Sequence, residues 1–334
     1  MQKILIIYTG GTIGMIKQNG VLVPFNIENL LSKIPLLSEF PAEIFTVSLD
    51  KPIDSSNANI DFWIKIVDII SINYENYDGF IILHGSDTMA YTASALSFMF
   101  ANLTKPVILT GSQLPIGLIR TDGRENLIAS LELACKTKND EKALIQEVCI
   151  YFESKLFRGN RTTKYSAEKF DAFFSPNFPL LAKVGTKIDI KVENLLYPEK
   201  ENIKIHKNFS SDIVILKLFP GISRNTVKAI TEIPELKGII LETFGAGNAP
   251  EDILDFLKIA IDNGIIIFNV TQCMNGKVEN IYAVGENLAN IGVVSGKDIT
   301  TEAALTKMMY LFGNNFSNNE IKKLLQQSLR GEIS

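Results

Sequence analysis

The chain has 334 residues, of which 46% are hydrophobic and 21% are charged, and its formal net charge is -4. These values are ordinary for a folded globular protein and give no reason to expect binding to nucleic acid or to an anionic membrane. The length fits two domains or one large α/β domain.

The N-terminal run from Ile4 to Tyr8 is shorter than the apolar region of a secretion signal, and it is followed at once by glycine-rich sequence. We therefore expect a buried first strand there. No apolar run approaches the length that crosses a bilayer. The three cysteines (Cys135, Cys149 and Cys273) are too few and too scattered for a disulfide framework, which favours a reducing, cytoplasmic location.

In the first half of the chain, short apolar runs bounded by turn residues alternate with helical patterns. The runs expected to be buried strands are Ile4–Tyr8, Gly79–His84, Pro106–Thr110 and Val148–Phe152. The segments expected to be helices are Asn59–Asn73, Thr88–Asn102 and Arg124–Cys135. Alternation of this kind predicts a doubly wound, mostly parallel sheet.

After about residue 180 the pattern changes. Lys187–Glu193 alternates apolar and charged residues and predicts a half-exposed strand, and the polar segment Tyr197–Ser211 reads as a linker. A second α/β series follows, with strands expected at Ile213–Leu218, Gly238–Leu241 and Ile265–Val270 and helices near Thr226–Ile233, Glu251–Asn263, Thr301–Phe312 and Asn319–Leu329. We therefore expect a larger N-terminal domain (1–192), a linker (193–211) and a smaller C-terminal α/β domain (212–334).

Three polar segments follow expected strands, where open parallel sheets bind their ligands. The first, TGGTIG at Thr9–Gly14, fits neither a dinucleotide fingerprint nor a phosphate loop, and alone it could be a simple turn. The second, HGSDTM at His84–Met89, places Ser86 and Asp87 before a helix, where they could cap it or stabilise developing negative charge. Capping and catalysis are both compatible with this position.

The third segment, RGNRTTKYSAEKFDAF, could be a solvated loop, but its Lys164 could serve as a base toward a hydroxyl in a dry cleft. The chain has two histidines, His84 and His206, and His206 falls in the expected linker, so a Ser-His-Asp hydrolase is disfavoured. Sites for transition metals are disfavoured for the same reason. A hydroxyl nucleophile assisted by lysine is the hydrolytic chemistry that remains.

TGGTIG and HGSDTM resemble two motifs of the bacterial-type asparaginase/glutaminase family, whose second motif usually reads HGTDTM. Six further matches cover nearly the whole chain: DSSN at Asp54–Asn57, TGSQLP at Thr110–Pro115, RTDGRENL at Arg120–Leu127, RGNRTTK at Arg158–Lys164, FGAGNAP at Phe244–Pro250 and TQCMNGKV at Thr271–Val278. RGNRTTK, GNAP and TQCMNGKV look most like the cytoplasmic type I branch. Separated motifs in the family's order make this resemblance specific.

The resemblance implies hydrolysis of L-asparagine to L-aspartate and ammonia through an acyl-enzyme, with no cofactor or metal. It implies that Thr12 is the first nucleophile. Ser86, Asp87 and Lys164 correspond to the family's second triad of Thr, Asp and Lys, in which Asp87 orients Lys164 as the general base. Within the family it is disputed whether both hydroxyls act as nucleophiles or whether one chiefly positions water.

The resemblance also implies a substrate site. Asp54 and Ser55 match residues that hold the α-amino and α-carboxylate groups, and Gly11 and Gly85 belong to turns whose N–H groups face the substrate. Asn248 matches a residue contributed by a neighbouring subunit, and the family assembles as homodimers or homotetramers. No nucleic acid or membrane partner is expected.

Three departures from the family pattern stand out. Ser86 replaces the usual threonine, no tyrosine occurs at 17–25 to assist Thr12, and Glu242 stands where some type I enzymes bind effector asparagine through an arginine. A lysine near Glu242 could instead pair with it. Two rival interpretations remain: a glutamyl-tRNA amidase subunit, disfavoured because that subunit carries a domain before its TGG motif, and a catalytically silent metabolite sensor.

Overall fold

The computed structural model describes residues 1–18, 21–24, 34, 37, 39–200, 202–279 and 283–334. Contacts divide the chain into two compact units, Met1–His206 and Lys207–Ser334. Segments of the expected linker belong to each unit: Lys204–Ile205 pairs with Phe100–Ala101, and Ser210 N–H donates to Met309 O. The domain boundaries inferred above remain a proposal.

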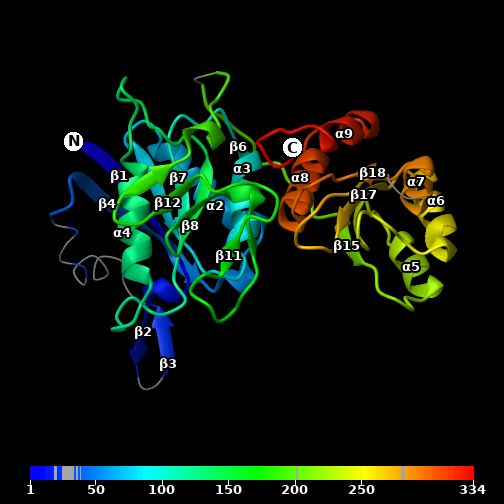
Figure 1. Cartoon of the computed structure of the whole chain (residues 1–334), viewed down its shortest axis with the longest axis horizontal. Helices are drawn as coiled ribbons and strands as arrows, with labels where there is room; N and C mark the ends of the chain where they lie inside the picture. Colours follow the sequence, from blue (N-terminus) through cyan, green and yellow to red (C-terminus); the bar gives the residue numbers. More distant parts are fainter. Residues whose placement is uncertain (19–20, 25–33, 35–36, 38, 201, 280–282) are drawn as a thin grey trace. The chain divides into compact units, whose positions relative to one another are not determined.

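The first unit is built on a mixed sheet (Figure 1), whose described strands are, in spatial order, β13 (Ile188–Ile190), β12 (Ala182–Val184), β9 (Lys155–Arg158), β8 (Val148–Phe152), β7 (Val107–Thr110), β5 (Gly79–Leu83), β1 (Gln2–Gly10) and β4 (Ala42–Ile53). The pairs from β8 to β4 are parallel, and the pairs from β8 to β13 are antiparallel. β1, β5, β7 and β8 are buried apart from the start of β1, as expected for a parallel sheet covered on both faces. The expected mostly parallel sheet is confirmed.

Helices cover both faces of this sheet. α2 (Ile60–Asn73), α3 (Met89–Met99) and α4 (Gly123–Ala134) are its described α-helices. Leu127 of α4 shares a core cluster with Ile4 and Ile6, which point to one face of β1 because alternate strand residues do so. Phe80 of β5 stacks on Tyr74 at the end of α2, on the opposite face. This is the doubly wound arrangement.

Short elements complete the first unit. They are the hairpin β2 (Met15–Gln18) and β3 (Val21–Pro24), the pairs β10 (Thr163–Lys164) with β11 (Phe173–Phe174) and β6 (Phe100–Ala101) with β14 (Lys204–Ile205), and the 3-10 turns η1 (Thr12–Gly14), η3 (Ser55–Asn57), η4 (Gly159–Arg161) and η5 (Val192–Asn194). The expectation that no tyrosine assists Thr12 concerns positions 17–25, whose side chains lie outside the described residues.

The second unit has a smaller parallel sheet, whose described strands are β15 (Ile213–Lys217), β16 (Gly238–Thr243), β17 (Ile266–Thr271) and β18 (Val294–Ser295). Its described helices are α5 (Arg224–Thr231), α6 (Leu254–Asp262), which follows the turn η6 (Glu251–Ile253), α7 (Ala283–Asn290), α8 (Thr301–Gly313) and α9 (Asn318–Leu325). Ile239 and Leu241 pack with Leu257 of α6, whereas Gly238 faces Met308 of α8. The smaller C-terminal α/β part is therefore also confirmed.

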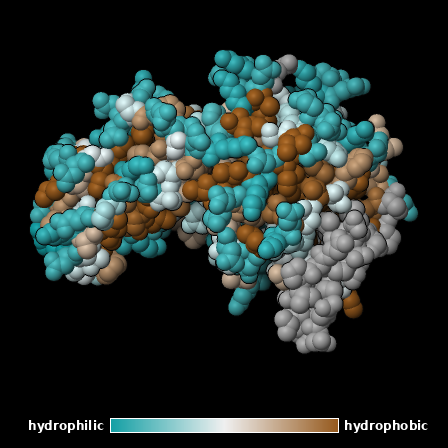
Figure 2. Space-filling model, turned by 180° about the vertical axis from the view of Figure 1, so that it is seen from behind, coloured by the Kyte–Doolittle hydropathy of each residue, from teal (hydrophilic) through white to brown (hydrophobic). Residues whose placement is uncertain are grey.

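Hydrophobic residues reach the surface between hydrophilic ones on the face seen in Figure 2. Among the described residues the most exposed large apolar side chains are Met1, Ile72 and Ile119, which are far apart in the sequence. Scattered apolar residues of this kind are normal on protein surfaces. Within the described ranges, no helix is long and apolar enough to cross a membrane.

Candidate active site

Three backbone segments meet at the carboxyl ends of β1 and β5. Gly11 has a φ of 88°, and a Cβ added there would lie 2.5 Å from Cα and N of Gly85. A Cβ added to Gly85 would lie 2.5 Å from the Ser55 Oγ. Only glycine allows such close approach, so Gly11, Gly85 and the buried Ser55 form one contact point. Thr12 and Ser86 each follow a glycine of this contact.

Hydrogen bonds made by residues at the end of β1 fix the turn that carries Thr12. β1 ends in two glycines with positive φ, and the chain then enters η1 at Thr12. The Tyr8 hydroxyl donates to Gly14 O at 3.0 Å, and the Thr9 hydroxyl donates to Leu83 O at 2.9 Å. Burial raises the pKa of Tyr8 to about 12, so this phenol remains a neutral donor. Thr12 therefore lies in a turn that a hydrogen bond ties back to β1.

Lys164 joins the second hydroxyl to a carboxylate. Its Nζ donates to Ser86 Oγ at 2.8 Å and to Asp87 Oδ1 at 2.6 Å. The lysine side chain is 13% exposed, whereas the Asp87 side chain is 67% exposed. Lys164 lies on β10, whose pairing with β11 sets its position, and Ser86 and Asp87 lie between β5 and α3. The structure thus brings together residues that are 77 and 78 positions apart.

Ser86 and Asp87 do not cap the helix that follows them. α3 begins at Met89, its N-cap residue is Thr88, and no side chain caps it. The Thr88 hydroxyl instead donates to Ser55 O at 2.7 Å, which ties the second glycine-rich turn to η3. Thr88 is a positioning residue that the sequence analysis did not single out.

Asp54 caps η3 beside this contact point. Its Oδ1 accepts hydrogen bonds from the Ser56 N–H and hydroxyl, both at 2.9 Å. These bonds, chiefly the one from the backbone N–H, hold the pKa of Asp54 below its usual value, so the carboxylate is charged. Because Asp54 is exposed, it presents this charge to solvent next to the buried Ser55.

Gln113, which was not among the predicted residues, contacts Ser86. The Ser86 hydroxyl donates to Gln113 Oε1 at 3.4 Å, and Gln113 Nε2 donates to Lys169 O at 2.9 Å. The buried Asp122 carboxylate accepts the Gln113 N–H at 2.9 Å and thereby fixes the turn after β7. A signal was available, because TGSQLP follows a buried strand as the other two glycine motifs do.

A series of hydrogen bonds between buried side chains ends at His84, two residues before Ser86. The Trp63 indole N–H donates to the Thr92 hydroxyl at 3.1 Å, and the Thr92 hydroxyl lies 2.9 Å from His84 Nε2. His84 Nδ1 lies 2.6 Å from Gly85 O, which can only accept, so the ring proton is on Nδ1 and Nε2 accepts from Thr92. Burial lowers the pKa of His84 to about 4, so the ring is neutral.

The remaining sequence-inferred residue, Asn248, lies in the second unit. Its backbone N–H and C=O bond Phe244 O and N–H at 2.8 and 2.9 Å, closing the turn after β16. Glu242, just before this turn, accepts from the Thr301 hydroxyl at 2.8 Å and has Lys217 Nζ at 3.5 Å. Pairing with a nearby lysine is therefore present at Glu242.

These geometries place Lys164 and Asp87 against the Ser86 hydroxyl, and Gly11 against Gly85, at the carboxyl edge of a parallel sheet. Two hydroxyl residues, an amine held by a carboxylate and backbone N–H groups in tight turns are the groups that acyl transfer from an amide requires. No group of three or more His, Cys, Asp or Glu residues able to hold a metal occurs in the described part of the chain.

Fold and site together define an α/β protein with a hydroxyl–lysine site. The chain belongs to the asparaginase family. The family model described as Asparaginase, N-terminal, matches residues 3–196, and the family model described as Glutaminase/Asparaginase C-terminal domain matches residues 212–325. L-asparaginase 1 of Escherichia coli (strain K12) is 43% identical over an alignment that covers 100% of this chain and 99% of that protein.

The crystal structure of L-asparaginase I from Vibrio cholerae is similar throughout, with a TM-score of 0.90, 42% identity and coverage of 100% of this chain and 99% of that one. The 60 kDa lysophospholipase of Mus musculus is 42% identical over 100% of this chain and 63% of its own length. The chain thus spans under two thirds of that mammalian relative.

Proposed function

We propose that this protein is an enzyme that hydrolyses L-asparagine to L-aspartate and ammonia. The observation that carries the proposal is the Lys164 ammonium, which lies 2.8 Å from Ser86 Oγ and 2.6 Å from Asp87 Oδ1. The similarity to L-asparaginase 1 of Escherichia coli over the whole chain supports asparagine as the substrate. No cofactor takes part in the proposed reaction.

The first step is attack of the Thr12 hydroxyl oxygen on the side-chain amide carbon. The C–N bond then breaks, ammonia leaves with the hydroxyl proton, and an ester links Thr12 to the aspartyl group. Water hydrolyses this ester and returns the proton to Thr12, which gives L-aspartate. Backbone N–H groups of the glycine-rich turns at Gly11 and Gly85 are suited to stabilise the oxyanion of each tetrahedral intermediate.

The second half of the site supplies proton transfer. Lys164 Nζ lies 2.8 Å from Ser86 Oγ, within reach of a proton transfer with that hydroxyl, and Asp87 holds the amine in place through its contact of 2.6 Å, as a general base requires. Ser86 in turn donates to Gln113 Oε1, so its hydroxyl has a defined orientation. These contacts support the proposal that Ser86 takes the role that the threonine of the second triad usually has in the family.

Substrate orientation follows from charge. Asparagine is a zwitterion, and the exposed Asp54 carboxylate suits its α-ammonium group, while the Ser55 hydroxyl suits its α-carboxylate. We include in the proposal that the site is completed by Asn248 of a neighbouring subunit, in a homodimer or homotetramer. The three cysteines are free thiols, which is compatible with the cytoplasmic location that we propose.

Steady-state release of ammonia from asparagine and from glutamine, each over a wide concentration range, tests this function. We expect saturable release from asparagine without added tRNA, cofactor or metal. Protein that is folded by circular dichroism yet releases no ammonia from either amide would overturn the proposal and favour a silent sensor on the same fold.

A further inference from the structure

A cavity of about 860 Å³ opens in the first unit, away from the candidate active site. Its lining includes Gln2 at the start of β1, Asp78 just before β5, Lys105 just before β7 and Gln146 just before β8. These four strands are parallel neighbours, so their amino ends share one edge of the sheet. The hydroxyl site lies at the opposite edge, and the cavity is therefore a separate place.

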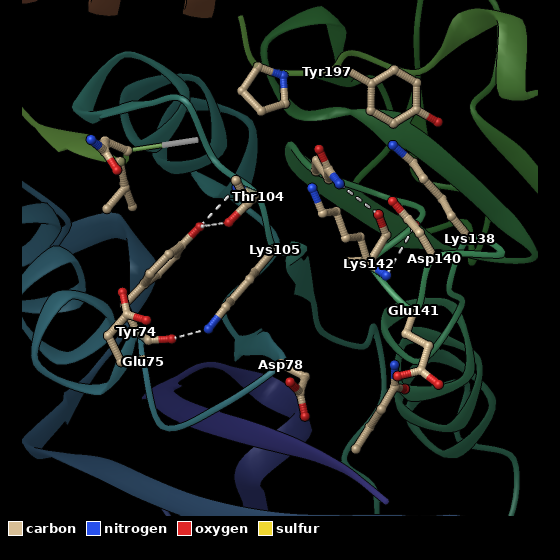
Figure 3. Close-up of a pocket in the computed structure, with 16 residues that line it drawn as sticks. Tyr74, Glu75, Asp78, Thr104, Lys105, Lys138, Asp140, Glu141, Lys142 and Tyr197 are labelled. Atoms are coloured by element: carbon tan, nitrogen blue, oxygen red, sulfur yellow. Dashed lines mark hydrogen bonds between the residues drawn. The ribbon is translucent and has the colours of Figure 1, made fainter. Parts of the chain in front are cut away.

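The lining carries both signs of charge. Three lysines and four carboxylates line the cavity: Lys105, Lys138, Lys142, Glu75, Asp78, Asp140 and Glu141. Figure 3 shows Lys138, Lys142 and Tyr197 near one end, with Asp140 beside the two lysines, and Asp78 and Glu141 near the other. A simple anion or cation would meet a group of its own sign in such a site, whereas a ligand with a positive and a negative end would not.

Lys138 and Glu141 are among the lining charges for which the described residues offer no ionic partner. The Lys138 ammonium lies 3.5 Å from the centroid of the Tyr197 ring and pairs with no carboxylate of the described chain. The Glu141 carboxylate likewise has no hydrogen-bond or ion-pair partner in the described ranges. Both residues belong to the loop closed by the bridge between Thr137 and Ala143, so one short loop presents opposite charges to the cavity.

The volume of the cavity and the amide groups in its lining indicate a ligand that is longer than one amino acid. The cavity lies toward the upper end of the range of about 300–1,000 Å³ that is typical of small-molecule sites, and one amino acid would leave much of it empty. Side-chain amides of Gln2, Gln146 and Asn202 also line it, and amides can both donate to and accept from a peptide backbone.

We propose that this cavity binds a short zwitterionic peptide. The peptide's α-carboxylate faces Lys138 and Lys142, and its α-ammonium group faces Asp78 and Glu141. The bound peptide spans the amino ends of these strands, and the carboxyl ends of two of them, β1 and β5, lead to Thr12 and Ser86. The proposal does not depend on the activity assigned to that other edge.

Isothermal titration calorimetry at low salt tests the proposal with trialanine as the probe. We expect a dissociation constant of about 1 mM, and binding at least about fivefold weaker for N-acetyl-trialanine amide, which has the same backbone without terminal charges. Lys138→Gln and Glu141→Gln should each weaken trialanine binding by about the same factor. Lys136→Gln is the matched control, because Lys136 pairs with Glu132 at 3.2 Å and does not line the cavity.

Lys164→Met separates the two edges of the sheet and should leave trialanine binding unchanged. Loss of binding in Lys164→Met would mean that the peptide occupies the hydroxyl site, and this would overturn the proposal. Equal binding of the capped peptide, no binding at ten times the expected constant, or full displacement of trialanine by inorganic phosphate would overturn it as well. Thermal unfolding of each variant establishes that its fold is retained.

Discussion

Acidification should destabilise the first unit through His84. Complete burial lowers the pKa of this ring from 6.5 to about 4. In the unfolded chain the His84 ring is therefore protonated below about pH 6.5, whereas in the folded chain it is protonated only below about pH 4. The stability contributed by neutral His84 is fully present above the unfolded pKa and is lost as the pH falls through this window.

The size of the effect follows from the shift. Each unit of pKa difference corresponds to about 1.4 kcal/mol, so a shift from 6.5 to about 4 gives about 3 kcal/mol across the window. His84→Gln removes the titrating ring but keeps a side chain that can both donate and accept. Its stability at neutral pH should fall because the chain through Thr92 is disturbed, but its further loss on acidification should be about 3 kcal/mol smaller than in wild type.

Urea unfolding followed by tryptophan fluorescence measures this difference directly. Trp63 is the only tryptophan, and its indole donates to the same Thr92 hydroxyl that contacts His84. Comparing about pH 7.5 with about pH 3.5 spans the window, and the contribution of the carboxylates cancels because wild type and variant share them. His206→Gln, which replaces the only other histidine, is the control for the loss of a histidine outside this hydrogen-bonded group. An unchanged slope in His84→Gln would refute the reasoning.

Three further predictions concern the proposed activity. Ser86→Thr should keep activity and Ser86→Ala should lower kcat by about a hundredfold or more, whereas equal activity of Ser86→Ala and wild type would leave Ser86 only a structural contact of Lys164. Mixing Thr12→Ala with Asn248→Ala protein should restore some ammonia release in heteromers, and no recovery despite verified subunit exchange would confine Asn248 to its own chain. Velocity against asparagine should be hyperbolic with a Hill coefficient of about 1, because Glu242, which is paired with Lys217, cannot give an effector carboxylate the bidentate pair that an arginine would; a sigmoidal curve that persists in Glu242→Ala would contradict this.

Buried parallel strands were the most predictable part of the fold. β5, β7 and β8 are short apolar runs between turn residues, and their expected bounds agree with the structure within one residue. β4 was missed because it is a long edge strand with exposed residues along it, so neither a continuous apolar run nor strict alternation marks it. β9 and β12 were missed because they are brief and pair antiparallel at the other side of the sheet.

The candidate site divides in the same way. The pattern drew attention to Thr12 and Ser86 because each follows a glycine in a turn after a buried strand, but either turn alone could be purely structural, and the family resemblance supplied the roles of both residues. The link from Lys164 to Ser86 required the family resemblance, since nothing local in the sequence brings residues 78 positions apart together. The hydrogen bonds that link Trp63, Thr92 and His84 could not be predicted, because each of these residues alone is typical of an ordinary core position.

The turnover number of two single variants tests the proposed chemistry most directly. Thr12→Ala and Lys164→Met should each lower kcat for asparagine by at least about a hundredfold, the scale of removing a nucleophile or a general base. Thr12→Ser, which keeps the hydroxyl, and Lys136→Met, which removes a lysine outside the site, should retain most of the activity. Near-wild-type turnover in folded Thr12→Ala or Lys164→Met would contradict the account.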